Sequence, residues 1–156
     1  MRHLLVGSFL LLVATAGFGQ QATLTAEGTR LAAGGGTLKF VATVAYDQAP
    51  KALGWLIKLP PGWSLQQTGG AQAPEIAPVP GTTTTLEWAY LTVPASTAQF
   101  EFTACYPAEI HQDQRISAEL LTCSDGQTTT IAVAGPVLRP PPSRPSVRPR
   151  PAEIAK

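Results

Sequence analysis

The chain has 156 residues, including 15 prolines, 14 glycines and two cysteines, and its formal net charge is +1. This charge is unevenly divided, because residues 20–134 hold five basic and nine acidic side chains whereas residues 135–156 hold five basic and one acidic side chain. An acidic domain with a basic tail that lacks aromatic residues does not fit a nucleic-acid-binding protein, and a chain without asparagine cannot carry N-linked glycans.

Residues 1–19 have the three parts of a secretory signal peptide. A short basic start is followed by an apolar run at 4–13 and then by small residues. The apolar run is shorter than the roughly 20 residues that a membrane-spanning helix needs. We expect cleavage after Gly19, with cleavage after Ala16 as the alternative. The mature chain is then secreted or periplasmic and has no transmembrane segment.

Residues 20–134 are long enough for one domain with a core, and they alternate between apolar and polar residues with period two. In the stretch 37–46, for example, Phe40 and Val44 share one face while Lys39 lies on the other. This alternation predicts strands at 22–26, 37–46, 53–59, 64–67, 84–90, 98–106, 115–122 and 128–133. Asp125-Gly126 is a hairpin signal between the last two. Seven or eight short strands predict an all-β fold, an antiparallel β-sandwich.

Three different turn motifs lie between these strands: Leu59-Pro60-Pro61-Gly62-Trp63, Pro80-Gly81-Thr82-Thr83 and Thr92-Val93-Pro94. Their order resembles that of accessory immunoglobulin-like modules of secreted and surface bacterial proteins, which occur beside glycosidases or as surface repeats. The resemblance spans residues 22–134. It implies an immunoglobulin-like β-sandwich with a non-catalytic role, as a spacer, a stalk, or an adhesion or carbohydrate-binding unit.

Trp63 has two interpretations. The alternation along their strands places Trp55 and Trp88 inward, whereas Trp63 follows a stiff Pro-Pro-Gly turn. The preferred interpretation is a half-buried lid at the end of the sandwich, because large aromatic rings tend to bury their area. The alternative is a ligand platform, with Gln66 and Gln67 as polar neighbours, that binds a cell-wall glycan.

No set of residues predicts catalysis, a cofactor or a metal. His111 is the only histidine after residue 19, and Glu109 and Asp113 share its parity, which allows a metal site in principle. The segment joins two strands, however, so we interpret it as a solvated loop. No other base is available to activate a serine or threonine. We therefore expect a protein that is not an enzyme.

The two cysteines, Cys105 and Cys123, end consecutive predicted strands. A secreted chain with two cysteines suggests a disulfide. Consecutive antiparallel strands, however, separate the two residues by about 20 Å at roughly 3.3 Å per residue, and a disulfide needs Cα atoms within about 7 Å. We expect no bridge within the monomer, although a bulge or strand swap permits one.

Residues 135–156 contain seven prolines, which cannot join the interior of a sheet, and they predict a disordered basic tail. The arginines of this tail either dock on anionic cell-wall or lipid surfaces or belong to a soluble spacer, which is preferred; they are Arg139, Arg144, Arg148 and Arg150. The sequence as a whole predicts a structural or interaction module of the bacterial envelope or exterior. Its partner is a protein or a cell-wall glycan, and its oligomeric state stays open.

Overall fold

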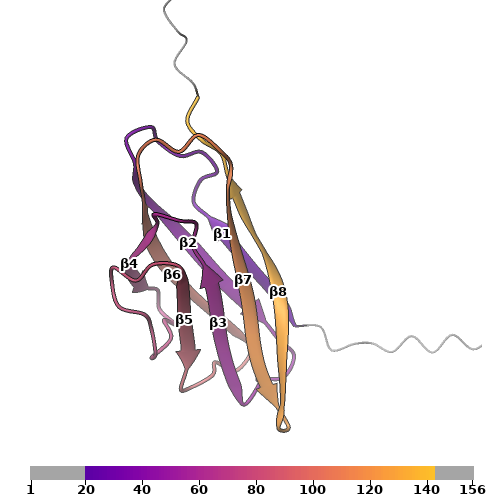
Figure 1. Ribbon diagram of the computed structural model, residues 1–156. Coiled ribbons are helices and arrows are strands. Elements are labelled where there is room, and N and C mark those ends of the chain that lie inside the picture. Colours follow the sequence, from indigo (N-terminus) through magenta and orange to yellow (C-terminus); the bar gives the residue numbers. More distant parts are fainter. Residues whose placement is uncertain (1–19, 143–156) are drawn as a thin grey trace, which may run out of the picture.

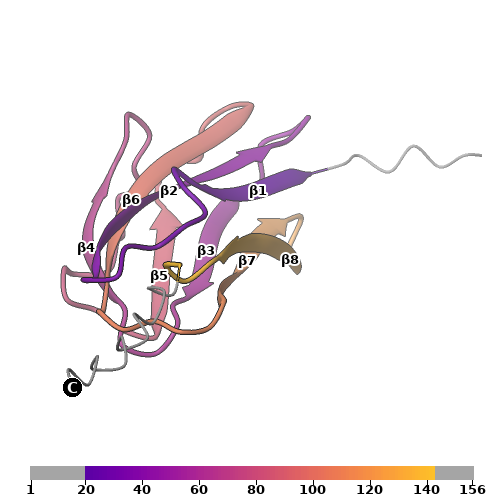
Figure 2. The same ribbon diagram turned by 90° about the horizontal axis from the view of Figure 1, so that it is seen from above.

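The computed structural model describes residues 20–142, which form a sandwich of two four-stranded antiparallel sheets (Figure 1). The strands are β1 (Gln21–Ala26), β2 (Gly36–Ala45), β3 (Ala52–Lys58), β4 (Ser64–Gly69), β5 (Thr85–Tyr90), β6 (Thr97–Tyr106), β7 (Gln114–Ser124) and β8 (Gln127–Leu138). One sheet has the order β1-β2-β6-β4 and the other the order β5-β3-β7-β8. Figure 2 shows the two layers from the end of the sandwich.

The predicted all-β fold is confirmed, and every predicted strand boundary lies within two residues of the observed one except the end of β8. The described residues contain no helix long and apolar enough to cross a bilayer. The predicted signal peptide at 1–19 lies outside the described residues, and so do Arg144, Arg148 and Arg150.

The core lies between the sheets, where the alternation predicted it. Phe40 of β2 pairs with Phe102 of β6, and their rings stack with centroids 4.9 Å apart. Trp88 of the opposite sheet reaches across to Phe102, with ring centroids 5.0 Å apart. Each such aromatic pair contributes about 0.5–1.5 kcal/mol beyond the burial of its area. These contacts join the two sheets into one core.

The boundary predicted at Ala134 is wrong, because β8 continues to Leu138, whose side chain is fully buried. The register of β7 and β8 shifts between Arg115 and Ser117, so that Gly135 and Pro136 form a bulge opposite Ile116. A proline is tolerated here because β8 is an edge strand and because a residue in a bulge does not need an N–H for the sheet hydrogen bonds. The composition of this segment therefore predicted a tail where the chain still belongs to the sheet.

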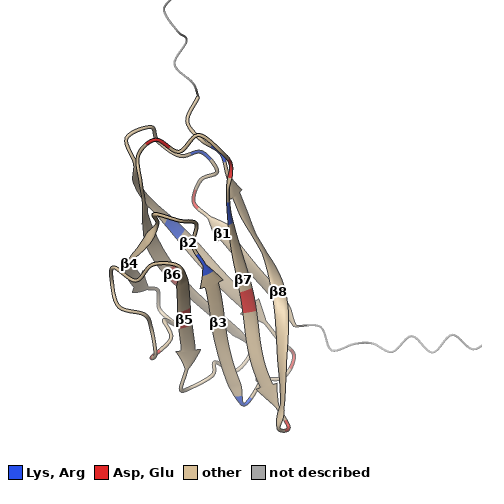
Figure 3. Ribbon diagram, viewed as in Figure 1, with Lys and Arg blue, Asp and Glu red and all other residues tan. Residues whose placement is uncertain are grey.

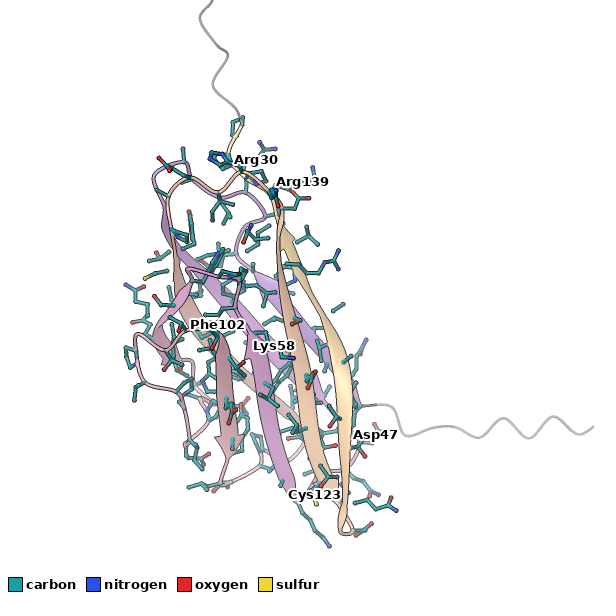
Figure 4. The ribbon with its side chains drawn as sticks, in the orientation of Figure 1. Arg30, Asp47, Lys58, Phe102, Cys123 and Arg139 are labelled. Carbon is teal, nitrogen blue, oxygen red and sulfur yellow. The ribbon has the colours of Figure 1, made fainter. Side chains whose placement is uncertain are left out.

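Arg139 also belongs to the domain and not to the tail. Its N–H donates to the carbonyl of Thr29 at 2.7 Å, and its carbonyl accepts from the N–H of Leu31 at 2.9 Å. The resulting parallel bridge between Arg30 and Arg139 ties one end of the sandwich together, and Figure 4 shows both residues at that end.

Candidate functional site

Trp63 is a core residue. The preferred interpretation, a lid, placed its ring against the core but only half-buried, and the alternative interpretation, a ligand platform, is wrong because the ring is fully buried. Its side chain is fully buried, with its ring centroid 5.2 Å from that of Tyr106 and 6.4 Å from that of Phe40. Its Nε1–H is buried without a hydrogen-bond partner. A ring in this position closes the core and cannot stack on a sugar.

The other two tryptophans are at most 2% exposed. Among residues 20–142 no tryptophan or phenylalanine ring lies on the surface, so this part of the chain offers no row of aromatic rings. Gln66 and Gln67 are exposed on the edge strand β4, where a register shift separates Leu65 from Gln67. The structure therefore does not bring these two glutamines together with Trp63 into a surface site.

The loop between β6 and β7 carries the other residues considered for chemistry. Glu109, His111 and Asp113 are all exposed there. Among the described residues, no three His, Cys, Asp or Glu side chains lie in a group that suits a metal ion. Glu109, His111 and Asp113 therefore lie on a solvent-exposed loop and do not form such a group.

Cys105 and Cys123 are both free, and each is half-buried. Cys105 belongs to β6 and Cys123 to β7, so they lie in different sheets. Both alternate with buried neighbours along their strands and therefore point to the outer faces of the sandwich. The two thiols thus mark opposite faces of the molecule.

The outer face of the β5-β3-β7-β8 sheet has the features of an interaction surface. Its central row, read across the paired strands, is Ala89–Gly54–Leu121–Thr130. Two shallow hollows on this face share Gly54, Ala89 and Leu121. Ile76, which is 50% exposed, pairs with Ala89 at the β5 edge and lines one of them. Figure 3 shows that charged positions are sparse on these strands.

Gly54 keeps the centre of this face open. A Cβ at this position lies 3.1 Å from the carbonyl oxygen of Trp88, closer than most real contacts. Glycine in a strand often marks a place where another group approaches the backbone closely. Glycine weakens a strand because it has no side chain to pack. At position 54 the same lack of a side chain leaves the hollow open.

The adjacent row is Glu87–Leu56–Glu119–Ala132, which places a carboxylate on either side of Leu56. Within residues 20–142 neither Glu87 nor Glu119 forms an ion pair. Leu56 and Leu121 alternate with buried residues on their strands and therefore point outward. Their place beside Gly54 and Ala89 depends on which strands are neighbours, and alternation within a single strand does not reveal that.

The outer face of the other sheet is different. It carries a set of threonines on three strands: Thr23, Thr25, Thr37, Thr43 and Thr103. Its lysine, Lys39, contacts Glu27 at 2.7 Å and Glu101 at 3.4 Å, so its charge is balanced. This is an ordinary solvated face, which singles out the β5-β3-β7-β8 face as the candidate site.

The fold is similar to that of solved β-sandwich proteins. A non-cellulosomal cohesin from the hyperthermophilic archaeon Archaeoglobus fulgidus superposes with a TM-score of 0.50 at 11% identity, covering 78% of this chain and 92% of the cohesin. A chain of the CaDoc0917–CaCohA2 complex superposes with a TM-score of 0.53 at 11% identity, covering 77% of this chain and 98% of that chain. No protein-family model and no curated protein matches the chain. At these identities the likeness shows the fold alone.

Proposed function

We propose that this chain is an exported, non-catalytic interaction module that binds a protein partner through the outer face of the β5-β3-β7-β8 sheet. The observation that carries the proposal is the low-charge centre of that face, where Gly54, Ala89 and Leu121 line two adjoining hollows. Exposed apolar area rimmed by polar groups is one feature of protein contact sites. Export rests on the signal peptide predicted at 1–19.

Two further observations support a protein partner. The face is broad and shallow, which suits another protein surface better than a small molecule, since small-molecule sites are concave and enclose their ligand. One of the chains with this fold was solved in a protein complex, CaDoc0917–CaCohA2. A glycan partner has less support, because the described residues carry no exposed tryptophan or phenylalanine on which a sugar ring stacks.

The test compares two matched glutamate substitutions. Leu121→Glu places a charge at the centre of the candidate face, and Thr103→Glu places one at a half-buried outward position of a central strand in the other sheet. Each mature protein, carrying an affinity tag, is incubated with envelope and secreted fractions of the cells that make it. Retained proteins are quantified by mass spectrometry, and parallel samples are incubated with chitin and peptidoglycan.

We expect wild type and Thr103→Glu to retain one partner protein in equal amounts. Leu121→Glu should retain at least tenfold less of it, because burying a charge in an apolar contact is costly. Circular dichroism checks that both variants are folded. Equal retention by all three proteins contradicts the assignment of this face. If wild type and Thr103→Glu bind chitin or peptidoglycan and Leu121→Glu does not, the partner of this face is a glycan and not a protein.

A further inference from the structure

β8 is the longest strand within residues 20–142 and forms one margin of the β5-β3-β7-β8 sheet (Figure 1). The strands at the other margins, β1, β4 and β5, have six residues each. Two of them are also covered by loop backbone: Ile76 bonds to Ala89 of β5, and Leu65 of β4 bonds to Gly81 and Thr82. Short or covered edges discourage pairing with other chains, whereas β8 has twelve residues and no charge.

The hairpin between β7 and β8 fixes which backbone groups of β8 point away from the sheet. Asp125 and Gly126 have φ angles of +52° and +78°, as a two-residue type I′ turn requires. The flanking residues Ser124 and Gln127 therefore exchange hydrogen bonds, and every second residue after Gln127 does the same with β7. The residues between them direct their N–H and C=O groups outward, and within residues 20–142 these groups have no backbone partner; they are Thr128, Thr130, Ala132 and Ala134.

β1 of the other layer lies beside β8 but does not pair with it. Figure 2 shows the two strands in separate layers, and no ladder joins them in the described part of the chain. Their chains meet beyond the two strands, where Arg139 bonds to Thr29 and Leu31. The margin of β8 between the hairpin and the bulge is therefore open to another strand.

The core under this margin is incompletely covered. Thr129, Ile131 and Val133 face the interior, because their partners on β7 are all buried. Val133 is buried as well, yet Ile131 is only half-buried and Thr129 is exposed. Gln20 and Thr122 line a hollow beside these last two side chains. A strand added here pairs with the free backbone groups and covers apolar area of Ile131 at the same time.

The shape of β8 selects one register for such a pairing. Its straight stretch begins after the turn at Gly126 and ends before the bulge at Gly135. The midpoint of this stretch is Ile131, with two of the outward residues on either side of it. An antiparallel pairing centred on Ile131 therefore uses every outward residue of the stretch.

We infer that two copies of the chain pair through β8, antiparallel and about a two-fold axis at Ile131. Thr128 of one copy then faces Ala134 of the other, and Thr130 faces Ala132. Ile131 faces its own counterpart, so that each half-buried side chain covers the other. A two-fold axis brings like side chains together, and like charges there are destabilising. The uncharged β8 meets this condition.

The pairing joins two four-stranded sheets into one of eight strands and leaves their outer faces free. The contact is therefore distinct from the face that binds a partner in the proposed function. Because each β8 edge occupies the other, the assembly closes at two copies. A dimer then offers two candidate faces side by side on one continuous sheet.

Sedimentation equilibrium of the mature chain tests the pairing, over about 1–200 µM protein so as to bracket a micromolar dissociation constant. Reductant keeps the native cysteines free. We expect wild type to form a dimer. Ala132→Pro should raise the dissociation constant at least tenfold, because it removes an outward N–H from each copy and leaves the β7–β8 ladder intact. Ala132→Ser keeps this N–H and should dimerise like wild type, and circular dichroism checks that both variants are folded.

A second measurement checks the register by disulfide formation under mild oxidation. Ile131→Cys places two thiols opposite each other at the axis, where the Cα atoms of a non-hydrogen-bonded pair are about 4.5 Å apart, a distance that suits a disulfide. Thr129→Cys faces the same side, but its two copies lie about 13 Å apart along the strands at ~3.3 Å per residue. Peptide mass spectrometry should find the link between the two 131 positions at least tenfold more often than that between the two 129 positions.

A wild-type chain that stays monomeric over this concentration range overturns the inference, and so does equal dimerisation of Ala132→Pro and Ala132→Ser. Disulfide formation that is as frequent at position 129 as at position 131 also overturns it, because the copies then meet in another register. These outcomes leave the proposed function testable on its own, since it is tested by retention of a partner by Leu121→Glu and Thr103→Glu.

Discussion

Among the individual residues, Trp63 shows how a turn can aim a side chain. Gly62 has a φ of +82°, a conformation that L side chains rarely adopt, and the N–H of Trp63 donates to the carbonyl of Pro60 at 3.2 Å. This turn sends the indole back between the sheets, against Phe40 and Tyr106. In this chain, the tryptophan that follows the Pro-Pro-Gly turn is therefore part of the hydrophobic core.

Trp63→Ala should lower the free energy of unfolding by about 3–5 kcal/mol, the usual range for removing a buried aromatic side chain. Trp63→Phe should cost less, partly because it also removes an N–H that is buried without a partner. Urea unfolding measures both effects. Gln66→Ala, at an exposed position, is the control and should change the free energy of unfolding by no more than about 0.5 kcal/mol. Equal midpoints for Trp63→Ala and Gln66→Ala contradict burial of the ring.

Gly135 is required for a different reason. A Cβ at this position lies 1.9 Å from the carbonyl oxygen of Ile116, a backbone atom that cannot move away without breaking the β7–β8 pairing. Gly135→Ala should therefore destabilise the protein by about 1–3 kcal/mol or more. Gly28→Ala, where nothing lies within 4 Å of the added atom, is the control for thermal unfolding. Similar melting temperatures for the two variants would refute the bulge.

Among the elements, the loop between β4 and β5 acts as an additional edge of the sheet. Ile76 and Ala89 exchange backbone hydrogen bonds of 3.1 and 3.0 Å. The carboxylate of Glu75 accepts from the N–H groups of Leu91 at 3.0 Å and Thr92 at 3.3 Å. These bonds protect the edge of β5 and hold Ile76 beside the candidate face.

The Glu75 contact predicts a dependence of stability on acid. Hydrogen bonds from its own backbone N–H, and then from those of Leu91 and Thr92, hold the pKa of Glu75 below its ordinary value of 4.5. A group with a lowered folded pKa contributes stability above its unfolded pKa and loses it as the pH falls. The urea midpoint of wild type should therefore drop below about pH 4.5 more steeply than that of Glu75→Gln. Asp47→Asn is the control, and parallel curves for wild type and Glu75→Gln refute the prediction.

For the whole molecule, one outer face is lined with threonines and the other has an uncharged central row, Ala89–Gly54–Leu121–Thr130. Two tyrosines are largely buried inside the sandwich. Tyr90 donates its hydroxyl hydrogen to the carbonyl of Gln72 at 2.9 Å, and Tyr46 donates to the carbonyl of Pro94. Both side chains are largely buried, at 7% and 5% exposure. Each hydroxyl fixes a connecting loop to the body of the sandwich.

Burial raises the pKa of both Tyr46 and Tyr90, and in Tyr90 nearby Tyr46 and Glu75 add to the effect. A raised folded pKa contributes stability below the unfolded value near 10 and loses it as the pH rises further. The urea midpoint should therefore fall between about pH 10 and 11, and less so in Tyr90→Phe. Absorbance at 295 nm follows the ionisation directly. A midpoint that stays constant to pH 11 would count against both burials.

The strands and their faces were predictable because alternation is a local property: Phe40 and Trp88 are inward whichever strands pair with theirs. The tertiary structure decided the rest. Only pairing between distant strands places Leu56 between Glu87 and Glu119, and only the bulge opposite Ile116 lets Gly135 and Pro136 stay within a strand. Only the turn at Gly62 brings Trp63 into the core. The physical reason is that a sequence encodes which side of its own strand a residue faces, whereas a surface is assembled from strands that become neighbours only on folding.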